Sequence, residues 1–218
     1  TQFGQMTVGS FMYIGPQGIV HGTTITILNA LRRIKNKNKW KLFLTSGLGG
    51  MSGAQPKAAK IAGITSITAE VNKNAIQKRF EQGWIDEIID NIDRLVRRIE
   101  ELKKKNEISS IGYHGNIVEI WEEFNKRKIF IDIASDQTSL HNPWSGGYYP
   151  ISLSFNEANK MIKVAPEIFK KHVKKSLLRQ VKAINNHTKK GTYFFDYGNA
   201  FLLESGRAKA NIFQKNGM

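Results

Sequence analysis

Short apolar runs alternate with longer amphipathic stretches along the 218 residues of this chain. The runs are typical of buried strands, because a parallel strand covered on both faces is apolar at consecutive positions. Strands are expected at residues 41–45, 64–69, 108–113, 129–134 and 192–195. The amphipathic stretches repeat apolar residues every three or four positions, as a helix packed through one face does. Helices are expected at 24–34, 54–62, from 73 onward, and at 85–105, 116–126, 156–164, 166–187 and 199–209.

The alternation of strands and helices predicts an α/β fold, with a doubly wound, mostly parallel sheet and helices on both of its faces. Neither an internal repeat nor a linker divides the chain, so residues 1–218 are expected to form a single domain. Within it, residues 1–40 would be a lead-in segment with a helix, and residues 41–210 would supply the sheet and its helices.

The segment after the first expected strand is rich in glycine. Its sequence, KLFLTSGLGGMSGAQ (Lys41 to Gln55), predicts a strand, a tight turn and the start of a helix. Gly47 and Gly49 would let backbone N–H groups approach a phosphate, and Gly53 would let the helix lie close to the strand. Glu70 ends the second expected strand, where a Rossmann unit places the carboxylate that holds a ribose diol. A plain structural turn could contain the same glycines, but the turn and the acid together favour a Rossmann-like sheet that binds a dinucleotide.

Polar motifs that contain glycine or follow closely on a strand end recur along the chain. They are His114-Gly115-Asn116, Asp136 to His141, and Asp196 to Asn199. Parallel strands end at one edge of their sheet, so these motifs should converge where open α/β sheets bind ligands. Each motif alone has a structural explanation, such as a helix N-cap for Asn116. Tyr148 and Tyr149, beside two glycines in a later loop, are candidates for ligand contact.

Composition narrows the classes of function. The chain has 33 Lys and Arg against 18 Asp and Glu, a net charge of +15, which invites a nucleic-acid interpretation. The cations at 94–105 and 170–190 lie among apolar residues at helical spacing, and no aromatic residues are interleaved with them. They therefore predict solvated outer faces of helices and no nucleic-acid site. The absence of a long apolar run and of a visible signal peptide predicts a cytoplasmic protein with no membrane span.

Several chemistries are disfavoured by the residues themselves. The chain contains no cysteine, and its histidines are too scattered for a metal site. Gly53 is followed by Ala54 to Pro56, which excludes a P-loop. His114 and His141 stand at strand ends, where a hydrogen-bonding loop residue is a simpler explanation than a catalytic base. Arg79 could approach an adenosine, but pairing with a carboxylate is the favoured explanation.

Several motifs resemble those of the urocanase (urocanate hydratase) family. They are YIGPQGIVHGT (13–23), TSGLGGMSGAQPKAA (45–59), DQTSLHNP (136–143) followed by GGYYP, and FDYGNA (195–200). The resemblance spans nearly the whole chain. It implies a hydro-lyase of histidine degradation that adds water to urocanate and yields imidazolone propionate. It also implies a tightly held NAD+ that acts as an electrophile toward the imidazole ring of the substrate, with no net redox change.

The family's cofactor contacts carry over where the motifs match. The pyrophosphate would meet Gly50, Met51 and Ser52, and the adenosine ribose would meet Glu70. The remaining NAD contacts implied by the resemblance are Gln5, Asn116, Ile117, Gln137, Thr138, Ser139, Leu140, His141, Tyr148, Tyr149 and Tyr197. This chain departs from some family members at Ala75, where they carry an arginine.

The resemblance also implies that part of the enzyme lies outside this chain. The family's catalytic cysteine belongs to a motif further along the full-length enzyme, and this chain has no cysteine. We therefore expect a central NAD-binding domain without catalytic residues of its own, from an enzyme family whose members are typically homodimers. Three other interpretations remain open: an S-adenosylmethionine-dependent methyltransferase, a conventional dehydrogenase, and a basic nucleic-acid-binding module.

Overall fold

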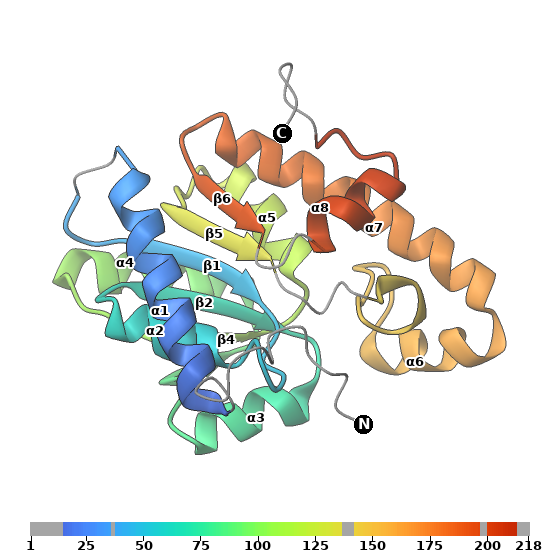
Figure 1. The fold of residues 1–218 in the computed structure, drawn as a ribbon, viewed down its shortest axis with the longest axis horizontal. Helices are drawn as coiled ribbons and strands as arrows, with labels where there is room; N and C mark the ends of the chain where they lie inside the picture. Colours follow the sequence, from blue (N-terminus) through green and yellow to red (C-terminus); the bar gives the residue numbers. More distant parts are fainter. Residues whose placement is uncertain (1–14, 36–37, 137–141, 197–199, 213–218) are drawn as a thin grey trace.

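The computed structural model describes residues 15–35, 38–136, 142–196 and 200–212. Within these ranges the chain forms one sheet of six parallel strands in the order β3-β4-β2-β1-β5-β6 (Figure 1). The strands are β1 (Leu42–Ser46), β2 (Thr65–Glu70), β3 (Glu87–Ile89), β4 (Ser110–His114), β5 (Ile133–Asp136) and β6 (Tyr193–Asp196). The predicted α/β class with a doubly wound, mostly parallel sheet is confirmed.

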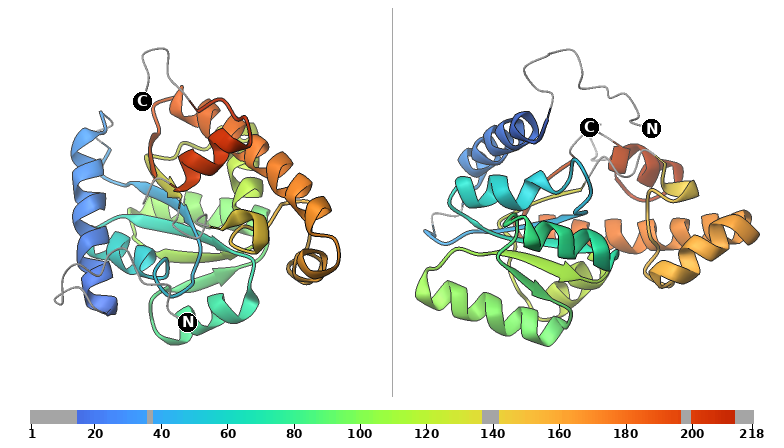
Figure 2. Two further views of the ribbon diagram at one scale, coloured as in Figure 1. Left: turned by 45° about the vertical axis from the view of Figure 1, so that its right-hand side comes forward. Right: turned by 90° about the horizontal axis from the view of Figure 1, so that it is seen from below.

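Helices cover both faces of this sheet, with α1 and α2 on one side and α4 on the other (Figure 2). They are α1 (Pro16–Arg33), α2 (Ala54–Ile61), α3 (Lys73–Glu81), α4 (Ile92–Lys105), α5 (Ile117–Lys126), α6 (Phe155–Val164), α7 (Pro166–Thr188) and α8 (Ala200–Arg207), with a short 3-10 turn η3 (Pro143–Ser145). The first helix begins at Pro16, ahead of the expected start at residue 24, because proline is well suited to the first turn of a helix.

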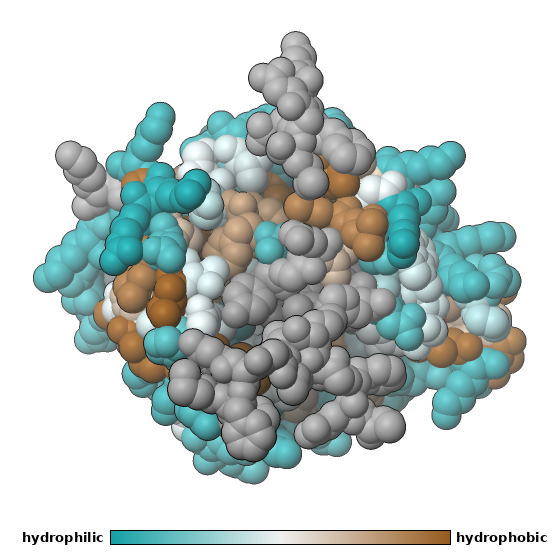
Figure 3. Space-filling view, viewed as in Figure 1, coloured by the Kyte–Doolittle hydropathy of each residue, from teal (hydrophilic) through white to brown (hydrophobic). Residues whose placement is uncertain are grey.

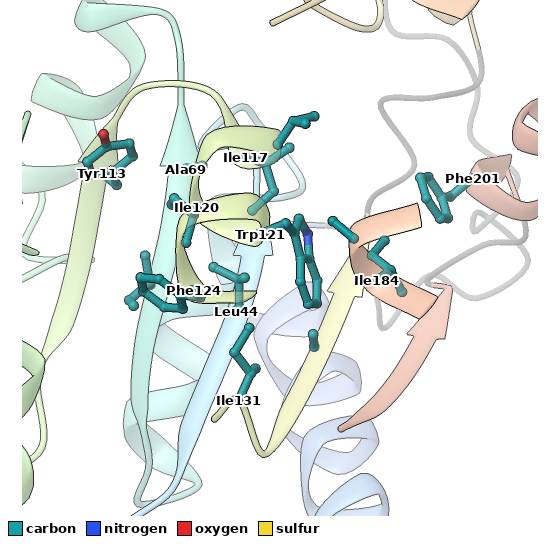
Figure 4. Close-up of a cluster of buried hydrophobic side chains, with 14 of the residues drawn as sticks. Leu44, Ala69, Tyr113, Ile117, Ile120, Trp121, Phe124, Ile131, Ile184 and Phe201 are labelled. Atoms are coloured by element: carbon teal, nitrogen blue, oxygen red, sulfur yellow. The ribbon is translucent and has the colours of Figure 1, made fainter. Parts of the chain in front are cut away.

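The alternating side chains of β1 show how the two faces are filled. Phe43 points to the layer of α1 and α2, where it packs in one cluster with Ile27 and Ala59. Leu42 and Leu44 belong to the cluster on the opposite face, which α4, α5 and α7 cover. In Figure 4 the apolar side chains of α5 lie over the strands of this second cluster. Both faces of β1 are buried, which explains why its sequence is a continuous apolar run.

The prediction of a single helix over residues 85–105 is wrong. Residues Glu87–Ile89 form the edge strand β3, which pairs with β4, and α4 begins only at Ile92. The Asn91 side chain caps that helix by accepting hydrogen bonds from the backbone N–H groups of Asp93 and Arg94, both at 3.0 Å. Apolar residues at 85, 88 and 89 fit a helical spacing, but Ile88 and Ile89 contribute to different clusters, as neighbours on a strand do.

The lysine-rich helices expose their cations, as the sequence predicts. On α7, Lys170, Lys171, Lys174 and Lys175 are exposed, whereas Phe169 and Val173 are buried. Figure 3 shows hydrophilic surface over much of this part of the molecule. None of the helices in the described part of the chain combines the length and the hydrophobicity that a membrane span requires.

The strand registers bring the predicted strand-end motifs to one edge. Ser46 pairs with Ala69, Glu70 with His114, and Asp136 with Asp196. The sheet grows in one direction from β1 through β2 and β4, and in the other through β5 and β6. The edge beyond β1 and β5 is therefore a topological switch point, the place where open α/β sheets form a ligand crevice.

Candidate functional site

A cleft of about 320 Å³ lies at this switch point. It is lined by five segments, namely the turn after β1, the end of β2, the loop after β4, Asp136 at the end of β5, and the loop 146–149. These segments are far apart in the sequence. The parallel sheet brings the strand ends together, and the loop 146–149 is held against them by contacts with α5 and α7. The cleft therefore combines the glycine turn and Glu70 in one site.

The glycine turn has the backbone geometry of an anion site. Gly47 has φ +87°, a conformation that favours glycine, and its N–H donates to the carbonyl oxygen of Ala69 at 2.7 Å. The N–H of Gly49 donates to the Ser52 hydroxyl at 3.1 Å, and α2 begins directly after Gly53. Added at Gly50, a Cβ atom would meet no atom within 4 Å, so the backbone there is bare.

Three consecutive backbone donors in this turn have no acceptor in the part of the chain that the structure describes. Among the described residues, the N–H groups of Gly50, Met51 and Ser52 make no hydrogen bond, whereas those of Gly53 and Ala54 bond back into the turn. Unpaired N–H groups ahead of a helix carry partial positive charge and can hold an anion such as a phosphate. The turn therefore has three adjacent N–H groups that an anion could accept from.

Glu70 has a structural role that sequence reasoning missed. Its Oε2 accepts the N–H of Leu48 at 2.7 Å, and its Oε1 accepts the N–H of Asn72 at 2.8 Å. The carboxylate thus connects the glycine turn to the start of α3, which Asn72 caps. A carboxylate can accept about four hydrogen bonds, so each oxygen keeps capacity for a ligand hydroxyl.

The loop after β4 is joined to the other wall of the cleft. Asn116 caps α5 by accepting the N–H of Val118 at 3.0 Å, as the structural explanation of its motif predicts. Its amide also donates to the carbonyl oxygen of Tyr149 at 2.8 Å. The ring of Tyr149 stacks on Phe155 at 5.0 Å between centroids, so this wall is supported from α6.

A buried polar network lies behind the cleft and was not predicted from the sequence. The hydroxyl of Tyr148 donates to Gln180 Oε1 at 2.9 Å and lies 2.8 Å from the hydroxyl oxygen of Ser176. The Gln180 amide donates in turn to Asp136 Oδ2 at 2.5 Å. Burial raises the pKa of Tyr148, so this phenol stays protonated and donates. Tyr148 therefore lines the cleft while its hydroxyl belongs to the network.

The predicted NAD contacts fall into three groups. Those that line the cleft are Ser52, Glu70, Asn116, Ile117, Tyr148 and Tyr149. Gly50 and Met51 lie in the glycine turn, beside the lining residues Gly49 and Ser52. Gln5, Gln137, Thr138, Ser139, Leu140, His141 and Tyr197 lie outside the described residues.

The remaining candidate residues do not line the cleft. His114 lies beside a neighbouring hollow at the start of α3. No group of three His, Cys, Asp or Glu side chains that could hold a metal occurs within the described ranges. The expected pairing of Arg79 with a carboxylate is wrong, because its guanidinium donates to the carbonyl oxygens of Leu48 and Gly49 and to the amide oxygen of Gln82.

Comparison with known proteins identifies the family of this chain. A family model, the Urocanase Rossmann-like domain, matches residues 15–216. The urocanate hydratase of Homo sapiens is 52% identical over 222 residues, which cover 99% of this chain and 33% of that protein. The probable urocanate hydratase of Caenorhabditis elegans is 53% identical over 218 residues, which cover 99% of this chain and 32% of that protein. The chain thus spans about a third of the length of the curated relatives it matches.

One solved structure shows a weaker likeness. A quinate dehydrogenase from Corynebacterium glutamicum in complex with NAD aligns with a TM-score of 0.33 and 11% sequence identity, over 78% of this chain and 56% of that chain. A likeness at this level supports no argument about the site.

Proposed function

The chain belongs to the urocanase family, of which it forms the Rossmann-like domain, and from this we propose that it binds NAD+ for the hydration of urocanate. The observation that carries the proposal is the row of three N–H groups at Gly50, Met51 and Ser52. They belong to the turn whose residues Gly47, Gly49 and Ser52 line the cleft together with Glu70. A dinucleotide needs donors for two phosphates and an acceptor for a ribose diol, and this cleft offers both.

The residues of the site fit the cofactor. The bare backbone at Gly50 leaves space for a pyrophosphate, since a Cβ there would contact nothing. The Glu70 carboxylate accepts the N–H of Leu48 in the turn and can still accept hydrogen bonds from ribose hydroxyls. The net charge of +15 adds a long-range attraction for an anionic dinucleotide.

The residues of this domain suit cofactor binding, and the catalytic cysteine must be supplied by another segment of the enzyme. When bound, NAD+ supplies an electrophilic ring. This chain would hold the cofactor and shield it from water with the loop 146–149, in which Tyr148 is anchored to α7. The cysteine that the family uses in catalysis would come from a segment outside these 218 residues, which contain none.

A calorimetric titration of this chain with NAD+ tests the proposal. We expect saturable binding at one site, and no comparable response to S-adenosylmethionine. Gly50→Val should weaken NAD+ binding at least tenfold, because the new side chain fills the space left for the phosphates, while its Cβ atom contacts nothing in the free protein. Lys57→Ala, an exposed change on α2, is the matched control. Saturable binding of S-adenosylmethionine without binding of NAD+ would overturn the proposal.

Catalysis should require more than this domain. The purified chain with saturating NAD+ is expected not to consume urocanate, whereas a longer protein that contains the family's cysteine motif should do so. Turnover by the 218 residues alone would contradict the proposed origin of the catalytic cysteine. Reduction of NAD+ by a substrate would instead favour a conventional dehydrogenase.

The compartment, oligomeric state and partners of the whole enzyme are part of the same proposal, which the family resemblance supports. We propose a cytoplasmic homodimer that does not use nucleic acid as a partner. Light scattering of the full-length protein tests the dimer. Binding to duplex DNA or RNA that weakens steeply with salt, with no response to NAD+, would favour a nucleic-acid-binding module.

A further inference from the structure

Arg79 holds the glycine turn from α3. Its Nε donates to the carbonyl oxygen of Leu48 at 3.0 Å and its Nη2 to that of Gly49 at 2.6 Å. The guanidinium is fixed on its other sides by Gln82, which accepts from Nη1 at 2.6 Å, and by the ring of Trp84, 5.3 Å from the Arg79 Cζ atom. Burial lowers the pKa of Arg79 from its usual value, but a guanidinium remains charged in proteins.

The space for this side chain exists because residue 53 is glycine. A Cβ atom added at Gly53 would clash with the Nε atom of Arg79 and would lie 2.8 Å from the carbonyl oxygen of Gly49. The sequence alone suggests that Gly53 serves close packing of the helix on the strand. The structure assigns it a different neighbour, the arginine that crosses the turn.

The two carbonyl groups that Arg79 holds determine the direction of two N–H groups. A trans peptide unit is planar, and its N–H and C=O bonds point in opposite directions. Fixing the carbonyl of Leu48 therefore orients the N–H of Gly49, which donates to Ser52. Fixing the carbonyl of Gly49 orients the N–H of Gly50, the first of the three donors without a protein acceptor.

Without Arg79 the carbonyl of Gly49 would keep only the N–H of Gly53, at 3.1 Å, as a partner. Glycine has more conformational freedom than any other residue, so the Gly49-Gly50 pair would then have to be ordered further when a ligand binds. We propose that Arg79 is a positioning residue that preorganises the Gly49-Gly50 peptide so that the turn meets a pyrophosphate with its N–H groups already aligned. This inference rests on the proposed binding of NAD+. It also places a guanidinium charge behind the turn, where it adds to the partial positive charge of the N–H groups.

The first test needs no ligand. Backbone ¹⁵N relaxation of the wild-type chain and of Arg79→Met should show ordered amides at Gly49 and Gly50 in the wild type and increased fast motion at both in the variant. Arg98→Met is the matched control, because Arg98 is also a half-buried arginine in hydrogen bonds with a neighbour, Glu87, but on α4, outside the cleft-lining segments. Unchanged order at both glycines in Arg79→Met would overturn the inference even if NAD+ binds.

The second test separates phosphate binding from the rest of the site. We expect Arg79→Met to bind NAD+ and ADP at least tenfold more weakly than the wild type, with unchanged affinity for adenosine in competition experiments. Arg98→Met should leave all three affinities unchanged. A general loss of structure would lower the affinity for adenosine as well, and that result would contradict a positioning role.

Two further variants distinguish geometry from charge. Arg79→Lys keeps the charge but lacks the planar fork that spans two carbonyl oxygens, so we expect it to lose most of the phosphate affinity. Gly53→Ala should cause a similar loss by displacing Arg79. Wild-type affinity in Arg79→Lys would show that charge alone matters and would overturn the inference. Failure of the wild-type chain to bind NAD+ would refute the proposed function and leave the relaxation test standing.

Discussion

Replacement of Glu70 separates two roles that one carboxylate combines in this structure. In the free protein it accepts the backbone N–H groups of Leu48 and Asn72, at 2.7 and 2.8 Å. In the proposed complex it also accepts the hydroxyl groups of a ribose. Glu70→Ala removes both roles, and the two losses can be measured independently.

The structure allows the stability loss to be worked out. Leu48 is 1% exposed, and its N–H would be left without an acceptor, at a cost of about 1–3 kcal/mol. Asn72 is half-exposed, so water can replace the carboxylate at its N–H for a cost of about 0.5–1 kcal/mol. The sum is about 3 kcal/mol, which corresponds to a fall in melting temperature of about 6–12 °C for a chain of this size.

The second loss is in ligand affinity. Hydrogen bonds from the ribose to a charged acceptor are worth about 1.5–3 kcal/mol, so NAD+ should bind roughly 10- to 150-fold more weakly to Glu70→Ala. Urea unfolding without ligand measures the first effect, and calorimetry at a temperature where both proteins are folded measures the second. Glu81→Ala, at an exposed position of α3, should change the free energy of unfolding by less than about 0.5 kcal/mol.

Each outcome has a clear meaning. An unchanged free energy of unfolding in Glu70→Ala would refute the role of the carboxylate in joining the turn to α3. A lower stability with unchanged NAD+ affinity would refute the ribose contact and leave the structural role intact.

Three further perturbations test polar groups that hold the fold together. Burial lowers the pKa of His187 from 6.5 to about 4, so the unfolded chain takes up a proton over this range while the folded chain does not. Stability should therefore fall by about 3 kcal/mol as the pH is lowered from 6.5 to 4, and His187→Phe, compared by urea unfolding, should lose this part of the pH dependence. Gln180→Leu removes a donor from the buried Asp136 carboxylate and should cost about 3 kcal/mol in the same assay, whereas a neutral effect would show that the contact contributes nothing. Asn116→Ala removes the cap of α5 and the hydrogen bond to Tyr149, and a loss of about 1–2 kcal/mol is expected; if thermal unfolding of this variant matches the wild type, the cap is not stabilising.

The sequence was sufficient where the physical cause is local. Continuous apolar runs predicted most of the strands, because burial on both faces requires them, and the positive φ at Gly47 agrees with the tight turn expected after β1. The segment 85–89 was assigned to a helix because a short apolar run fits a helix or a strand equally well. Its pairing with β4 decided the matter, and β4 lies beyond the whole of α4 in the chain.

Tertiary structure alone decided how the site is supported. Arg79 holds carbonyl groups 30 and 31 residues away in the sequence, and Gln180 reaches Asp136 across 44. Neither contact has a sequence signature, because arginine and glutamine occur on solvated helix faces far more often than in such networks. Which donor meets which acceptor depends on how α3 and α7 pack against the sheet. The glycines and Glu70 could thus be recognised along the chain, whereas the groups that hold them in place became visible only when distant segments were brought together.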